Sequence, residues 1–222
     1  MRKGLKAIAN RSVKPFLQWY LRRPRMYSHN GIHIEVPPGV FHPGFFFSSK
    51  QLAHFLGTLD LRSKEFLEIG CGSGFVSITA AKRSAHVTCT DLSPVAVDAT
   101  KKNAAVNSVK MEILQSDLFA SVPQKQYDII AVNPPYYPRN PETMEEHAWY
   151  AGEDFSYFKR FFRDAKNFVH PSSQVLMVLS DECDLGAIRA IAEKENWRWT
   201  PASIQKTFFE TGYIILITPS LG

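Results

Sequence analysis

The 222-residue sequence predicts an α/β fold in which helices cover a mostly parallel sheet. Short apolar runs alternate with helical patterns through most of the chain, which is the pattern of parallel strands joined by crossover helices. A glycine-rich turn joins the first of these strands directly to a helix, and acidic residues follow the next two strands. Hydrophobic residues make up 45% of the chain, which is enough to bury one sizeable core in a single domain.

The first segment, residues 1–38, is expected to be a basic, helical extension ahead of a main domain at residues 39–222. Eight arginines and lysines and no acid lie within residues 1–25, whereas the formal net charge of the whole chain is only +5. Such a segment could contact nucleic-acid phosphates, or it could be a solvated basic tail.

Two helices are expected in this extension. Leu5, Ala9 and Val13 have helical spacing, and Pro15 is well placed to open a second short helix that ends before Pro24. The stretch that follows alternates poorly and contains a Pro-Pro-Gly turn, so residues 32–41 are expected to form an entry loop or a short edge strand.

The remaining elements follow in regular order. Strands are expected at Glu65–Ile69, His86–Thr90, Met111–Gln115, Tyr127–Val132 and Gln174–Leu179. Helices are expected at about 51–59, 74–83, 94–107, 154–169 and 184–195. The last two runs, 197–206 and 213–218, are rich in β-forming residues and flank a turn, so they predict an antiparallel hairpin.

The loop after the first parallel strand has glycines at alternate positions, Gly70, Gly72 and Gly74. Only glycine lets the backbone turn this tightly and approach a ligand this closely, and the amides at the following helix start can meet an anionic group. Cys71 lies inside this predicted cofactor loop, where we expect it to fill space as a small residue.

Asp91 ends the second parallel strand, next to Leu92. A carboxylate at this position can accept hydrogen bonds from both hydroxyls of a ribose. Ser93 is the more natural cap for the helix that begins near Pro94, which leaves Asp91 available for a ligand.

Asp117 and Leu118 follow the third strand. Asp117 can take the amino group of an adenine while Leu118 packs on its ring, although an aspartate here also fits a simple turn. The carboxyl ends of neighbouring strands form the ligand crevice of an open α/β sheet, so these groups together predict an adenosine pocket.

Asn133-Pro134-Pro135-Tyr136 ends the fourth strand in a stiff turn. Neither proline has an amide proton, so the loop presents bare acceptors in the Asn133 side-chain oxygen and the Pro134 carbonyl. Two fixed acceptors suit a planar NH2 group, and their hydrogen bonds strengthen as positive charge develops on an attacking nitrogen. Tyr136 is expected to lie against the planar face of the substrate.

Together these motifs resemble class I S-adenosylmethionine-dependent methyltransferases of the Asn-Pro-Pro-Tyr type, from about Gly39 to the end of the chain. Within that group, the sequence from Asn133 to Pro138 and the later Ala151-Gly152-Glu153-Asp154 look most like the glutamine methyltransferases that modify release factors or ribosomal proteins. The resemblance implies a Rossmann-like seven-stranded sheet of order 3-2-1-4-5-7-6 with strand 7 antiparallel. It also implies S-adenosylmethionine as cofactor and S-adenosylhomocysteine as product.

The resemblance further implies a role for individual residues. Glu68, Gly70 and Gly72 would line the methionine end of the cofactor, and Ser48 corresponds to a hydroxyl residue that touches the cofactor. The chain departs from the release-factor enzymes because it carries a short basic extension in place of their longer helical N-terminal domain.

Several functions remain open on sequence alone. The first choice is transfer to a protein glutamine amide, and the alternative is an adenine or guanine exocyclic amine in RNA or DNA. A nicotinamide-dependent oxidoreductase would share the glycine loop, but Phe75 stands where its third glycine belongs. A non-catalytic nucleic-acid-binding module would leave the Asn-Pro-Pro-Tyr loop unexplained.

Other residues are expected to be structural. Phe155, Phe158 and Phe162 have the spacing of a buried helix stripe, and His147 is expected at the surface. The consecutive phenylalanines at 45–47 could stack on a base, but burial beneath the first helix is favoured. The three cysteines show no metal-ligand spacing, and no apolar run is long enough to cross a membrane, so we expect a metal-free cytoplasmic protein. The sequence leaves the oligomeric state open, and a monomer is the expectation.

Overall fold

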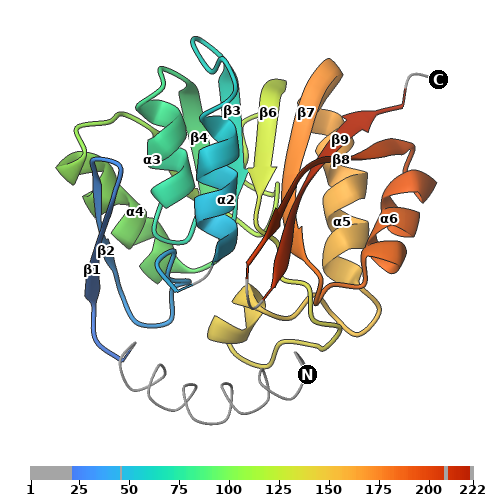
Figure 1. Cartoon of the computed structure of the whole chain (residues 1–222), viewed down its shortest axis with the longest axis horizontal. Helices are drawn as coiled ribbons and strands as arrows, with labels where there is room; N and C mark the ends of the chain where they lie inside the picture. Colours follow the sequence, from blue (N-terminus) through green and yellow to red (C-terminus); the bar gives the residue numbers. More distant parts are fainter. Residues whose placement is uncertain (1–21, 46, 208–209, 221–222) are drawn as a thin grey trace.

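The computed structural model describes residues 22–45, 47–207 and 210–220, and it confirms the predicted α/β architecture (Figure 1). The strands of its main sheet are β3 (Glu65–Ile69), β4 (His86–Asp91), β5 (Glu112–Gln115), β6 (Tyr127–Val132), β7 (Val169–Ser180), β8 (Trp197–Lys206) and β9 (Thr211–Pro219). Their spatial order is β5-β4-β3-β6-β7-β9-β8, and β9 is antiparallel to both of its neighbours. Counted from β3, this is the order that the resemblance implied.

Helices cover both faces of the sheet. They are α2 (Phe47–Leu56), α3 (Phe75–Ala81), α4 (Pro94–Val106), α5 (Ser156–Ala165) and α6 (Leu185–Lys194), with the short 3-10 helices η1 (Glu145–Ala148) and η2 (Lys166–Phe168). Figure 1 shows α2 and α3 side by side on one face, with α5 and α6 farther along the sheet. The helix predicted at 154–169 is shorter, because α5 tightens into η2 and β7 already begins at Val169.

Two apolar cores lie on opposite faces of the sheet because successive side chains of a strand point in opposite directions. Phe66 of β3 belongs to the core beneath α2 and α3, whereas Leu67 belongs to the core beneath α5 and α6. On the second face, Phe158 and Phe162 of α5 are fully buried, which confirms the expected stripe. Phe155 is only partly buried at the start of that helix.

The described part of the predicted helical extension is a β-hairpin instead. It consists of β1 (Arg25–His29) and β2 (Ile32–Val36), which pair antiparallel. Ile32, Ile34 and Val36 are buried and the residues between them are exposed, so the alternation is regular. Of the two expectations for residues 32–41, the short strand is confirmed over Ile32–Val36. The two helices expected before Pro24 fall on residues 1–23, of which only 22 and 23 are described, in a turn.

Two asparagines four residues apart, Asn103 on α4 and Asn107 at the C-terminal cap of α4, fasten the hairpin to the domain. Asn103 accepts a hydrogen bond from the Glu35 amide at 2.8 Å and donates to the Glu35 carbonyl at 2.9 Å. Asn107 makes the same pair of bonds with His33, at 3.0 and 2.6 Å. The two asparagines are four residues apart, and their partners on β2 are two residues apart, so the two pairs align. The asparagine amides thus take the place of a neighbouring strand along this edge of β2. Asn103 also donates to the Ser73 carbonyl at 2.9 Å, which ties the glycine loop to the same clamp.

Replacing Asn103 by alanine is expected to lower the free energy of unfolding by about 2 to 4 kcal/mol, because the part-buried backbone groups of Glu35 and the buried carbonyl of Ser73 lose their partners. Chemical denaturation would measure the loss. Lys102→Ala is the matched control, since Lys102 is the exposed neighbour on the same helix and should change stability by less than about 0.5 kcal/mol. Equal effects of the two substitutions would show that the clamp contributes nothing.

Candidate functional site

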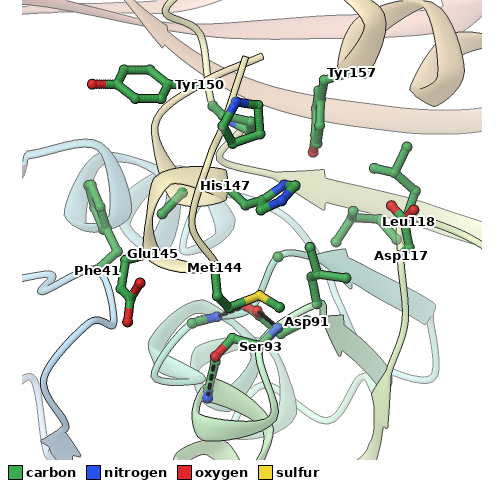
Figure 2. Close-up of a pocket in the computed structure, with 18 of the residues that line it drawn as sticks. Phe41, Asp91, Ser93, Asp117, Leu118, Met144, Glu145, His147, Tyr150 and Tyr157 are labelled. Carbon is green, nitrogen blue, oxygen red and sulfur yellow. Dashed lines mark hydrogen bonds between the residues drawn. The ribbon is translucent and has the colours of Figure 1, made fainter. Parts of the chain in front are cut away.

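A cavity of about 570 Å³ opens at the carboxyl ends of β3, β4, β5 and β6 (Figure 2). This volume is in the range of small-molecule sites, and the edge of the sheet is the one that the sequence predicted. The predicted site residues that line the cavity are Gly70, Gly72, Asp91, Leu92, Asp117, Leu118, Asn133 and Pro135.

The glycine loop needs glycine at each of the three positions. Gly70, Gly72 and Gly74 have φ angles of 76°, 56° and 80°, a left-handed region that side chains disfavour. A Cβ on Gly74 would also lie 2.8 Å from the Thr100 methyl group. Cys71 points away from the cavity: its side chain is buried and its Sγ lies 3.6 Å from the Thr100 hydroxyl.

Asp91 is held rigidly by the backbone around it. Its Oδ2 accepts from the Gly72 amide at 2.8 Å and its Oδ1 from the Ser93 amide at 2.9 Å. Ser93 is the cap of α4, as predicted, with its side chain accepting from the Ala96 amide at 3.4 Å. Burial raises the pKa of Asp91, against these backbone hydrogen bonds, which lower it. Each carboxylate oxygen keeps a lone pair for a ligand hydroxyl.

Asp117 and Leu118 follow β5, the strand that pairs with β4, and both line the cavity. Arg160 of α5 donates to Asp117 Oδ2 at 2.7 Å, so a helix from the second half of the chain fixes this carboxylate. Leu118 is buried and has a φ of 51°, an unusual angle for a branched residue, and the Ser116 hydroxyl donates to its carbonyl at 3.0 Å. Backbone strain of this kind gathers at ligand-binding positions.

Asn133 lies at the edge of the cavity with one end of its amide fixed. Its Nδ2 donates to the Ser48 hydroxyl at 3.2 Å, which leaves the Oδ1 atom as the available acceptor. Among the described residues, no group donates to this oxygen or to the Pro134 carbonyl. Pro134 and Pro135 are buried, so the turn that carries both acceptors is supported from behind.

Backbone hydrogen bonds tie the acceptor loop to the segment after η1. The amides of Tyr136 and Tyr137 both donate to the Trp149 carbonyl, at 3.2 and 3.0 Å, and the Ala151 amide donates to the Tyr137 carbonyl at 2.9 Å. The Tyr137 hydroxyl donates to Glu182 at 2.6 Å, which links the loop to the turn after β7. These contacts fix the direction in which the loop leaves β6.

Some predicted site residues lie behind the cavity and do not line it. Glu68 is buried under the glycine loop, accepts a hydrogen bond from the Ser77 hydroxyl, and has its pKa raised by burial to about 8. Tyr136 packs against the second core, and burial raises its pKa to about 12. The others outside the lining are Ser48, Cys71, Gly74 and Pro134.

The structure also places residues at the cavity that sequence reasoning missed. Met144, the cap of η1, and His147, within η1, line the cavity. His147 is exposed, as expected, but its exposed side chain faces this cavity. A four-residue 3-10 helix has no periodicity from which its position could have been predicted. Phe45 is 47% exposed and lies against His42, so the expected burial is wrong for this residue, and Phe46 is outside the described residues.

The described residues contain neither a cluster of metal ligands nor a helix that could cross a membrane. No group of three or more histidines, cysteines or acids in this part of the chain could hold a metal ion. None of the described helices combines the length and hydropathy that a membrane crossing requires.

Comparison with known proteins identifies a family and relatives that resemble this chain in sequence and fold. Residues 31–194 match the methyltransferase small domain family. A protein described as an N5-glutamine methyltransferase of Methanocaldococcus jannaschii is 37% identical over 109 residues, which cover 49% of this chain and 53% of the relative. Ribosomal RNA small subunit methyltransferase C of Escherichia coli is 35% identical over 114 residues, which cover 50% of this chain and 32% of the relative.

A solved structure shows the same fold. The 16S rRNA methyltransferase of T. thermophilus, in complex with AdoMet and guanosine, superposes with a TM-score of 0.66 at 19% identity, covering 90% of this chain and 50% of that one. The matched part of the present chain thus spans between about a third and a half of the length of these relatives.

Proposed function

Because this chain belongs to the methyltransferase small domain family, we propose that it transfers a methyl group from S-adenosylmethionine to a planar nitrogen, that of a protein glutamine side chain. The observation that carries the proposal is the Asn133 amide, fixed at one end by Ser48 and open at its oxygen on the edge of the cavity.

The residues of the cavity fit this cofactor. Asp91 offers two oriented oxygens to the ribose, and Asp117 and Leu118 suit an adenine, as predicted. Thr90 also lines the cavity, and its buried hydroxyl has no hydrogen-bond partner among the described residues. The glycines let the backbone approach the amino-acid end closely. S-adenosylmethionine supplies an electrophilic methyl group and leaves S-adenosylhomocysteine as product.

Asn133 and Pro134 carry the chemistry on the acceptor side. The side-chain oxygen of Asn133, which lines the cavity, and the carbonyl oxygen of Pro134, which lies outside the lining, accept the two protons of an NH2 group and so orient the nitrogen lone pair toward the cavity. The hydrogen bonds strengthen as positive charge develops on that nitrogen, which lowers the barrier to transfer. One proton must leave the nitrogen after transfer, and bulk solvent can take it. Tyr136 packs on the core side of the loop, and its contact with the planar face of the substrate stays a prediction.

Charge around the acceptor loop favours a protein substrate over RNA. Between Pro138 and Phe155 the chain has five acidic residues and one arginine, and residues 181–184 add three more acids. The Tyr137–Glu182 hydrogen bond places this second segment beside the loop. A phosphate backbone would be repelled here, whereas a polypeptide would not. Transfer to an exocyclic amine of a nucleic-acid base is therefore the second candidate, for which the basic residues 1–25 would have to supply the attraction.

Incubation with labelled S-adenosylmethionine and cell extract tests the substrate class. We expect the label to enter a macromolecule, to survive nuclease and to be lost on protease treatment. Loss on nuclease treatment alone would assign the substrate to nucleic acid. Stabilisation of the folded chain by a reduced nicotinamide and not by S-adenosylmethionine would reverse the choice of cofactor.

The setting of the reaction is also a proposal. The described cysteines Cys71, Cys89 and Cys183 are all free thiols, which suits a reducing compartment such as the cytoplasm. We propose that the chain works there as a monomer on a macromolecular substrate.

A further inference from the structure

We propose that His147 stacks on the adenine of the bound cofactor and forms the roof of the adenosine pocket, opposite Leu118. This assignment rests on the proposed function, since it needs an adenosine in the cavity. Sequence reasoning gave His147 no role, and the mechanism above does not use it.

The first support is the placement of η1. A 3-10 helix has three residues per turn, so residues three apart face the same way. Met144 caps η1 and His147 lies three residues later, and both line the cavity. Figure 2 shows the His147 ring reaching toward the side of the cavity that holds Asp117 and Leu118.

The second support is the shape of the space that these side chains enclose. Leu118 is buried and locked by its backbone, so it offers a fixed apolar surface on one side. Tyr157 reaches into the same space from α5, and the Arg160–Asp117 pair marks its end (Figure 2). A space bounded by an apolar surface and an aromatic ring, with a carboxylate at its end, suits a flat base that carries an amino group.

The third support is that contacts of the residues flanking η1 hold this helix in place. The Trp149 ring lies 5.5 Å from the Phe41 ring, and the Arg139 guanidinium lies 5.0 Å from the Tyr150 ring. The Trp149 carbonyl accepts from the amides of Tyr136 and Tyr137. The position of His147 is therefore set by contacts on both sides of η1, and a ligand that packs beneath it contacts a structure that is already formed.

Binding measurements on three ligands test the assignment. We expect His147→Ala to raise the Kd of S-adenosylmethionine, S-adenosylhomocysteine and 5′-methylthioadenosine by about tenfold each, as loss of one base–aromatic contact does. 5′-Methylthioadenosine carries the adenosine without the amino acid, so an equal loss places the contact on the adenosine half. His147→Phe keeps a flat ring and should bind within about threefold of the unchanged chain. His54→Ala, an exposed histidine on α2, is the matched control and should leave all three constants unchanged.

Three outcomes would overturn the assignment. They are unchanged Kd values in His147→Ala, a loss for S-adenosylmethionine that 5′-methylthioadenosine does not share, and failure of His147→Phe to restore binding. A fall in kcat at saturating cofactor with unchanged Kd would give His147 a role on the acceptor side instead. If the unchanged chain binds none of the three ligands, the proposed function itself fails, and this result is distinct from every result for the variants.

Discussion

Asn133→Ala is expected to lower kcat by about 100- to 1000-fold while the Kd of S-adenosylmethionine changes by less than about threefold. The magnitude is that of removing one preorganised electrostatic contact from a transition state. The Asn133 oxygen is the acceptor best placed to stabilise charge on the substrate nitrogen, because its amide is oriented by the Ser48 hydroxyl at 3.2 Å. Single-turnover kinetics with labelled cofactor would give the rate, and titration calorimetry would give the Kd.

Two further variants make this test specific. Ser48→Ala frees the Asn133 amide without removing it, so kcat should fall by less than in Asn133→Ala. Gln124→Ala removes an exposed amide ahead of β6 and should leave kcat unchanged. Weak cofactor binding by Asn133→Ala together with a normal transfer rate would refute the role proposed for this residue.

Asp91→Ala is expected to raise the Kd of S-adenosylmethionine by at least about 100-fold. Each hydrogen bond from a ribose hydroxyl to a charged acceptor contributes about 1.5 to 3 kcal/mol, and both oxygens of Asp91 are oriented for one. The substitution also frees the amides of Gly72 and Ser93, so the glycine loop loses part of its support. Titration calorimetry with S-adenosylmethionine and S-adenosylhomocysteine would measure the loss.

Asp91→Asn separates binding from folding. The asparagine has the same shape but offers an NH2 group where one backbone amide needs an acceptor, so binding should fall while the fold persists. Asp98→Ala, an exposed aspartate on α4, is the matched control and should bind cofactor normally. If Asp91→Ala kept full affinity with a normal thermal transition, the ribose would have to lie elsewhere.

The elements that the sequence predicted well are those whose pattern is local. Strands β3 to β6 are short apolar runs bounded by turn residues, and the residues at their carboxyl ends meet because parallel strands end on the same edge. Asp91, Asp117 and Asn133 therefore came together as expected, although they lie far apart in the chain. The sheet order came from the resemblance alone, because spacing does not determine which strands are neighbours.

A short edge strand was one of two expectations for residues 32–41, where β2 lies, whereas β1 and the hairpin turn were not predicted although their signal is present. Asn30-Gly31 is a common two-residue turn, both residues have positive φ, and the following strand alternates strictly. The basic residues before the hairpin and the helical spacing of residues 2–13 predicted a helical extension over the whole of residues 1–38. His147 is a different case, because its position depends on long-range contacts of Trp149 that no local pattern reveals.

The segment from Arg139 to Gly152 is closed at its base by main-chain hydrogen bonds, among them one from the Gly152 amide to the Arg139 carbonyl at 3.0 Å. Because these hydrogen bonds fix the two ends of the loop, the geometry of the ends depends little on the length of the loop between them. Each doubling of the length of a flexible loop raises the free-energy cost of closing it by only about 0.6 kcal/mol. Residues of the segment that do not line the cavity can thus change while Asn133, which precedes the segment in the chain, keeps its place. In such an arrangement, the residues that face a partner can change without moving His147 or Asn133.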